Sequence, residues 1–171
     1  NSKLKKLIIP AWVTTIHENA FKFCSNLAEI VFETNDGDAT LTIKEAAFYN
    51  CNDITEITLP SHLNTLEKNA FGSCDDLKTV NVESFSRDSE ANLAFSNGAF
   101  ADKPGKKTAN NADLLAAWTA KYFVQTVNIG KQTGYINIKG VFGNLVDNVT
   151  VDPENNSYIS ENGVLYGKGE S

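Results

Sequence analysis

The sequence predicts an α/β fold, built as a right-handed solenoid with a parallel sheet of about six short strands and few helices. Three observations predict it. The chain repeats one apolar frame, a phenylalanine recurs ahead of that frame, and 42% of the residues are hydrophobic, as in a globular protein. Repeats of roughly 20 to 30 residues cannot bury their own apolar faces, so neighbouring copies must stack.

Each predicted strand has apolar residues at the first, fourth and sixth positions of a short frame, as in Leu27, Ile30 and Phe32. Six copies occur, and their middle positions are 7, 30, 57, 80, 127 and 149, in steps of 23, 27, 23, 47 and 22 residues. The long steps contain insertions at 33–40, at 83–92 and from 102 to about 123. The frame predicts parallel strands in one sheet, because strand side chains alternate between two faces.

A second apolar set stands between the strands. It consists of one phenylalanine per copy, each after a small residue: Phe21, Phe48, Phe71, Phe100 and Phe142. In three copies a cysteine follows three residues later: Cys24, Cys51 and Cys74. We expect the phenylalanines to stack as a spine opposite the sheet. Because the cysteines are odd in number and share one repeat position, we expect a column of buried, unbridged thiols.

The longest insertion has helical spacing. Leu114, Leu115, Trp118 and Tyr122 form one apolar stripe, and Asn111 stands where an N-cap is favoured. The pattern predicts one inserted helix near 111–122, packed on the solenoid with Trp118 and Tyr122 in the contact.

The whole chain, 1–171, is predicted to form a single repeat domain. The repeats are clear in 4–82 and degenerate in 93–171. The chain opens inside a repeat and has no methionine, so we interpret it as a fragment of a longer repeat protein. An uncapped first strand leaves an open edge, so we also expect self-association through the amino-terminal edge.

Two segments reproduce one pattern almost completely: "LIIPAWVTTIHENAFKFCSNLAEI" (7–30) and "ITLPSHLNTLEKNAFGSCDDLKTV" (57–80). They resemble the BspA-type leucine-rich repeat family of bacterial cell-surface proteins. The resemblance implies a leucine-rich-repeat solenoid, an extracellular or cell-surface location, and a role in adhesion to host protein or other cells. The tail from Val149 to Gly169 resembles a divergent repeat of the same family.

Composition and motifs exclude several function classes. A net charge of −6 argues against a nucleic-acid surface, which needs clustered Lys and Arg. No apolar run approaches the ~20 residues that span a bilayer, so we expect no membrane insertion of this segment. His17 and His62 stand outside any nucleophile or metal motif. We therefore predict no catalytic residues, no metal, no cofactor and no enzyme.

The predicted sheet offers the leading binding surface. Residues that flank the inward positions point outward and form two columns along the sheet. The first four members of one column are Lys6, Glu29, Glu56 and Thr79, and those of the other are Ile8, Val31, Thr58 and Asn81. We expect a basic or amide-rich segment of a host or matrix protein to dock near Glu29, Val31 and Glu56. The other interpretation is that Thr and Asn are ordinary strand residues that bind nothing.

A second hypothesis is a carbohydrate-binding module attached to a larger glycan-processing protein. It predicts aromatic side chains aligned on one surface to contact a glycan, and Trp12, Phe23 and Tyr49 in the turns of adjacent repeats are the candidates. Trp12 stands where the matching repeat has the polar His62. It can also serve to cover a neighbouring turn.

Overall fold

The computed structural model describes residues 3–35, 37, 39–82, 94–95, 100, 124–131 and 146–168. Within these residues the chain coils through twelve strands joined by turns, and no helix occurs among them. The α/β prediction is therefore wrong for this part of the chain, which is an all-β solenoid. The helix predicted near 111–122 and Phe142 lie outside the described residues, and the right-handed sense stays a prediction.

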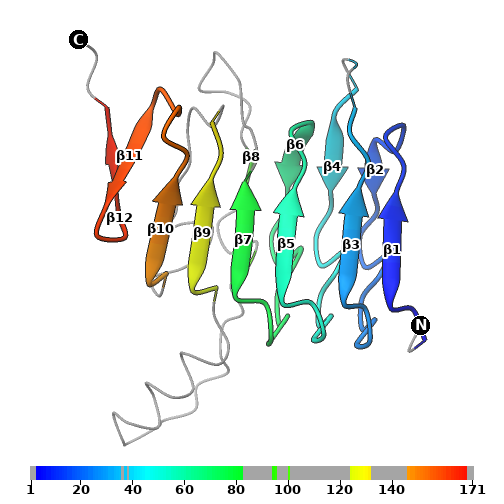
Figure 1. Cartoon of the computed structure of the whole chain (residues 1–171). Coiled ribbons are helices and arrows are strands. Elements are labelled where there is room, and N and C mark those ends of the chain that lie inside the picture. Colours follow the sequence, from blue (N-terminus) through cyan, green and yellow to red (C-terminus); the bar gives the residue numbers. More distant parts are fainter. Residues whose placement is uncertain are drawn as a thin grey trace, which may run out of the picture.

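Six parallel strands stand side by side in the front sheet (Figure 1). They are β1 (Lys6–Ile9), β3 (Glu29–Phe32), β5 (Glu56–Leu59), β7 (Thr79–Val82), β9 (Thr126–Ile129) and β10 (Asn148–Val151). The register aligns the predicted middle positions, with Leu7 beside Ile30 and Val80 beside both Ile57 and Val127. The predicted strand positions are therefore confirmed for all six copies.

The front sheet is interrupted once. One hydrogen-bonded ladder joins β1 to β3, and a second set of ladders joins β5, β7, β9 and β10 in that order. Between these two groups, β3 and β5 lie side by side without a ladder. This interruption coincides with the step of 27 residues between Ile30 and Ile57, where the neighbouring intact steps are 23. One continuous sheet was expected, so the insertion at 33–40 accompanies a change that the frame alone did not predict.

A second parallel sheet, the back sheet, runs behind the first (Figure 1). Its strands are β2 (Thr15–Ile16), β4 (Leu41–Ile43), β6 (Leu63–Leu66) and β8 (Ala94–Phe95), in the order β2-β4-β6-β8. Buried and more exposed side chains alternate along β4, as expected of a strand with one face on the core: Leu41 and Ile43 are fully buried, and Thr42 between them is half-buried. This sheet was not predicted, because strands of two to four residues are too short to show an alternating period.

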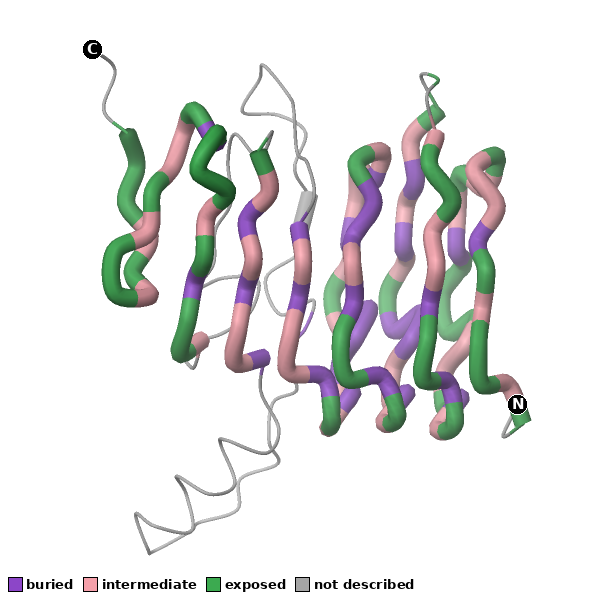
Figure 2. Tube along the Cα trace, viewed as in Figure 1, coloured by how far each residue is buried: buried purple, intermediate pink, exposed green. Residues whose placement is uncertain are grey.

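The core fills the space between the two sheets. Along the front strands, buried and more exposed residues alternate (Figure 2). Ile57 and Val80 of the front sheet are buried, as are Leu63 and Leu66 of the back sheet. Full burial of one such side chain contributes roughly 1.5–3 kcal/mol, so stacking supplies what a single repeat lacks.

The predicted phenylalanine spine is confirmed in the described coils. Successive ring centroids lie 5.2 Å apart from Phe21 to Phe48, 5.0 Å from Phe48 to Phe71 and 5.3 Å from Phe71 to Phe100. The rings are within 10° of parallel. One ring per coil thus forms a continuous stack, which fixes the relative position of neighbouring turns.

We call the segments 17–28, 44–55 and 67–78, which contain the spine and the cysteines, the Phe–Cys turns. Each has two residues with left-handed backbone: Asn19 and Phe23 (φ 57° and 62°), Ala46 and Asn50 (54° and 59°), Asn69 and Ser73 (55° and 52°). Left-handed residues interrupt an α-helix, which explains why these connections contain none. Backbone N–H groups of one turn donate to carbonyls of the next, as from Phe21 to Ala47 and from Phe48 to Ala70, both at 2.8 Å.

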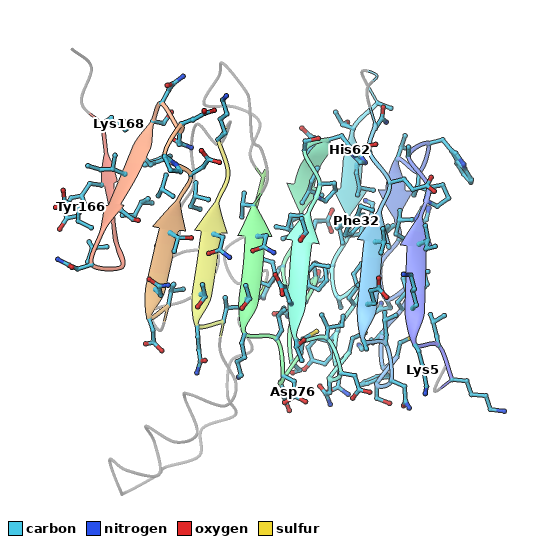
Figure 3. The ribbon with its side chains drawn as sticks, in the orientation of Figure 1. Lys5, Phe32, His62, Asp76, Tyr166 and Lys168 are labelled. Atoms are coloured by element: carbon cyan, nitrogen blue, oxygen red, sulfur yellow. The ribbon has the colours of Figure 1, made fainter. Side chains whose placement is uncertain are left out.

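The chain ends in an antiparallel hairpin of β11 (Tyr158–Glu161) and β12 (Val164–Gly167). Asn162 and Gly163 form its turn with φ of 52° and 77°, as a two-residue hairpin requires. Figure 3 shows Tyr166 and Lys168 at this end of the solenoid and Lys5 at the other. The Asn-Gly pair is a strong hairpin signal that our interpretation of the tail as a divergent repeat did not use.

Candidate binding surfaces

The front face contains the two predicted columns of outward residues. Parallel pairing places Lys6 beside Glu29 and Ile8 beside Val31, and on the other side of the interruption Glu56 beside Thr79 and Thr58 beside Asn81. The columns continue through Thr126 and Asn148, and through Asn128 and Thr150. Since neighbouring strands are about 4.8 Å apart, these side chains form a regular array.

The amino-terminal part of this face contains an ion pair beside apolar side chains. The Lys6 ammonium lies 2.7 Å from a Glu29 carboxylate oxygen, and both side chains are about half exposed. Ile8 is 53% exposed, next to the half-buried Val31. The charge of Glu29 is therefore already matched by Lys6, which weakens the expected attraction of Glu29 for a basic partner.

The rest of the face contains a hydrogen-bonded ladder of amides and hydroxyls. The Asn81 side-chain amide donates to Glu56 Oε1 at 2.6 Å and to Thr58 Oγ1 at 3.1 Å. Asn128 donates to Asn81 Oδ1 at 2.6 Å, and the Thr150 hydroxyl donates to Asn128. We call these five side chains the Asn–Thr ladder. Each of these four hydrogen bonds runs from a donor to an acceptor on the strand nearer the amino terminus, and one branch of the ladder ends on the Glu56 carboxylate.

The three residues of the predicted docking point, Glu29, Val31 and Glu56, differ in their contacts. Glu29 belongs to an ion pair, whereas the partner of Glu56 is the uncharged side-chain amide of Asn81. Val31 lies on β3, at the interruption between β3 and β5. Among the described residues of the two outward columns, Glu56 is therefore the acid that is not paired with a basic side chain.

The aromatic candidates do not form one platform. Phe23 and Tyr49 lie together, with ring centroids 6.1 Å apart, but their planes make an angle of 87°. Trp12 is 78% exposed and lies between the end of β1 and the start of β2. Phe23 follows the other end of β2, so Trp12 and Phe23 lie at opposite ends of the strands. Figure 3 shows the same separation in a later coil, between His62, which is equivalent to Trp12, and Asp76 of the third Phe–Cys turn.

One shallow depression of about 310 Å³ lies at the carboxyl ends of β7, β9 and β10. It is lined by residues 81–82, 128–130 and 150–152. Asp152 is the one ionisable side chain among them. A nucleophile–base pair is absent from this lining, so the depression offers shape but no evident chemistry.

The cysteines are buried thiols without disulfides, as predicted. Cys51 Sγ donates to the Phe21 carbonyl and Cys74 Sγ to the Phe48 carbonyl, both at 3.2 Å. Burial raises the pKa of Cys51 to about 12 and raises that of Cys74 further. Both thiols therefore stay protonated near neutral pH and are poor nucleophiles and metal ligands.

Other potentially reactive side chains in the part of the chain that the structure describes also show no arrangement for catalysis or metal binding. Burial lowers the pKa of His62, so its imidazole is neutral near pH 7. Among the described residues, no three His, Cys, Asp or Glu side chains are grouped to hold a metal ion. The same residues contain no helix long and apolar enough to cross a bilayer.

The apolar frame, the phenylalanine spine and the cysteine column together make a distinctive repeat. Residues 1–103 match the family described as the BspA type leucine rich repeat region (6 copies). This chain belongs to the BspA-type leucine-rich repeat family. The match covers both of the complete repeats and the described part of the spine, so the family pattern and the observed stacking concern the same residues.

Among solved structures, this BspA-type chain is similar to a leucine rich cell surface protein from Faecalibacterium prausnitzii A2-165. The two are 16% identical, with a TM-score of 0.36 over 97% of this chain and 43% of that one. The chain thus spans less than half the length of that protein. No curated protein matches the sequence.

Two features of the surfaces were missed by the sequence analysis. Lys22, Gly72 and Ser73 surround the Phe23–Tyr49 pair, and Asn155 holds the hairpin. Aligning the Phe–Cys turns would have placed Lys22, Tyr49 and Gly72 at one repeat position, since each follows the spine phenylalanine directly.

Proposed function

We propose that this chain is a non-catalytic binding module of a bacterial surface or secreted protein, which contacts a host protein, a matrix protein or another cell. The observation that supports it best is the front face, where strand pairing aligns outward residues in two columns. Such a face is broad and shallow, which suits a macromolecular partner better than a small substrate.

The proposed contact lies at the interruption of the front sheet. Glu56 supplies a negative charge, and Val31 and Ile8 supply apolar contact on the adjacent strands. The partner segment is expected to be basic or rich in amides, because a carboxylate that is not paired with a cation attracts cations and accepts further hydrogen bonds. Rim charges of this kind mainly affect the association rate and its salt dependence.

The test reverses charge on the face. The variant Glu29→Lys/Glu56→Lys is expected to attach several-fold more weakly to immobilised matrix proteins and to cultured cells, with the largest loss at low salt. A matched control exchanges the ion pair, as Lys6→Glu/Glu29→Lys, which keeps both the pair and the net charge.

The comparison of variants separates the acids. If Glu56 provides the contact, the Lys6/Glu29 exchange retains attachment and Glu56→Lys alone loses it. Unchanged attachment of the Glu29→Lys/Glu56→Lys variant, with a native circular dichroism spectrum, would reject the front face as the contact surface.

A further inference from the structure

The turn edge opposite Trp12 contains a small side-chain cluster built from three consecutive coils. Phe23 and Tyr49 pack edge to face, and the Lys22 ammonium lies over both rings, 5.3 Å from the centroid of Phe23 and 5.2 Å from that of Tyr49. The third coil contributes Gly72 and Ser73. We call these five residues the aromatic turn site.

The third coil holds Tyr49 in place. The Ser73 hydroxyl donates to the Tyr49 hydroxyl at 2.9 Å. A Cβ built on Gly72 would come within 3.1 Å of Tyr49 Cδ2, so the ring lies across the position that a side chain would need. Glycine at 72 therefore lets the Tyr49 ring approach the next turn closely.

Phe23 occupies a backbone position that disfavours it. Its φ is 62°, and the equivalent residues of the next two coils are Asn50 and Ser73. Asn tolerates left-handed backbone by bonding locally, whereas a bulky ring there is a genuine outlier. The ring is also 58% exposed, so burial does little to offset this strain. A strained, exposed side chain held by specific neighbours is the pattern of a binding residue.

The charges around the site indicate the chemistry of its ligand. The Lys22 ammonium over both rings shows that they attract a cation, and more than half of the Phe23 side chain is exposed to a partner. Exposed carboxylates follow on the next coils. Asp53 donates its backbone N–H to the Ser25 carbonyl at 3.2 Å, two residues beyond Phe23, and Asp76 is exposed on the same edge (Figure 3).

We propose that the aromatic turn site binds an arginine side chain of a partner protein, stacked on the Phe23 ring and paired with an exposed carboxylate of the same turn edge, that of Asp53 or Asp76. Guanidinium is planar, stacks on aromatic faces and pairs with carboxylates in a fork, which an ammonium cannot do. Two rings at 87° give no coplanar platform for a sugar. The site lies apart from the front face and does not rest on the function proposed for that face.

The experiment uses the whole chain and two peptides. The probe is acetyl-Gly-Arg-Gly-Arg-Gly amide, and its control carries citrulline, the neutral isostere, in place of each arginine. Amide chemical shifts of the labelled protein are followed during titration at physiological salt. The arginine peptide is expected to shift the amides of Phe23 and Tyr49, and the citrulline peptide to leave them within error.

Variants then separate binding from folding. Phe23→Asn copies the residue of the next coil, so it should fold, melt at a higher temperature and bind the arginine peptide about three- to tenfold more weakly. Trp12→Ala removes an exposed aromatic from the opposite edge and should bind as the parent does. Equal binding by Phe23→Asn, equal shifts from the citrulline peptide, or no shift at either ring would overturn the proposal. Shifts of the same amides by a soluble glycan, with none from arginine, would assign the site to sugar instead.

Discussion

Asn155 joins the carboxyl-terminal hairpin to the solenoid, and its substitution should release that hairpin selectively. The residue is fully buried. Its side-chain amide donates to the Gly130 carbonyl at 2.8 Å, and its oxygen accepts from the N–H groups of Ser157 and Tyr158, each at 2.8 Å. One side chain thus satisfies three backbone groups, on the segment after β9 and at the start of β11.

The cost of Asn155→Ala follows from the groups left without a partner. A buried donor or acceptor without a partner costs roughly 1–3 kcal/mol. Three such groups together set the upper limit of the destabilisation. Ser157 and Tyr158 are only half-buried, so water can hydrogen-bond their N–H groups in the variant and reduce the cost. We expect about 3 kcal/mol, which is roughly a 100-fold increase in the opening equilibrium of the hairpin.

Native-state hydrogen exchange measures this local opening directly. Amides of β11 and β12 should exchange roughly 100-fold faster in Asn155→Ala, while amides of β4 to β6 keep the parent rates. The matched control is Asn156→Ala, which removes the same amide from the exposed neighbour. The Lys168 ammonium donates to the Asn155 backbone carbonyl, a contact that neither substitution deletes.

Equal exchange rates in the two variants would refute the reasoning. The hairpin would then be docked by the packing of Tyr158 and Leu165 on the core, and not by the Asn155 hydrogen bonds. A uniform acceleration over the whole chain would also contradict it, because it would mean that the hairpin and the coils open together.

Three further properties of the molecule are testable. Ellman's reagent should react little with the native protein and should find three thiols after unfolding, whereas one thiol in the unfolded chain would mean a disulfide. Burial raises the pKa of Cys51 to about 12, against about 8.5 for an exposed thiol, so the contribution of this thiol to stability is full below about pH 8.5 and falls as pH rises toward 12. Urea denaturation should therefore show a lower unfolding free energy at about pH 10 than at about pH 8. An unfolding free energy that stays constant over this range would contradict the prediction. The outer edge of β1 has no described strand beside it, so sedimentation should show concentration-dependent self-association, and a strict monomer at high concentration would count against pairing at this edge.

The sequence was sufficient to predict the front strands, the outward columns and the described part of the spine. Repetition explains this success, because a frame that recurs six times averages out the local exceptions of each copy. Phe32, for example, stands where the other copies have Ile, Leu or Val, yet its strand pairs in register with β1. The cysteines were predictable for the same reason, since a shared repeat position becomes a shared position in space.

The parts that were missed depend on contacts between coils. The back strand β2 has only two residues, too few to show an alternating pattern. The 87° angle between Phe23 and Tyr49 follows from the Ser73 hydrogen bond and the space at Gly72, which lie one coil further along. The partners of Glu29 and Glu56 likewise come from neighbouring strands, so a list of outward residues could not show which acid is paired with a basic side chain.

The interruption of the front sheet has a mechanical consequence. Traction along the stacking axis loads the hydrogen bonds between coils, which lie nearly parallel to the force. Where β3 meets β5, the front ladder is missing, while β4 and β6 remain paired in the back sheet. Under tension this junction should therefore open first on its front side, with the back ladder as the pivot. The solenoid would yield there by bending, as a stiff rod with one compliant joint.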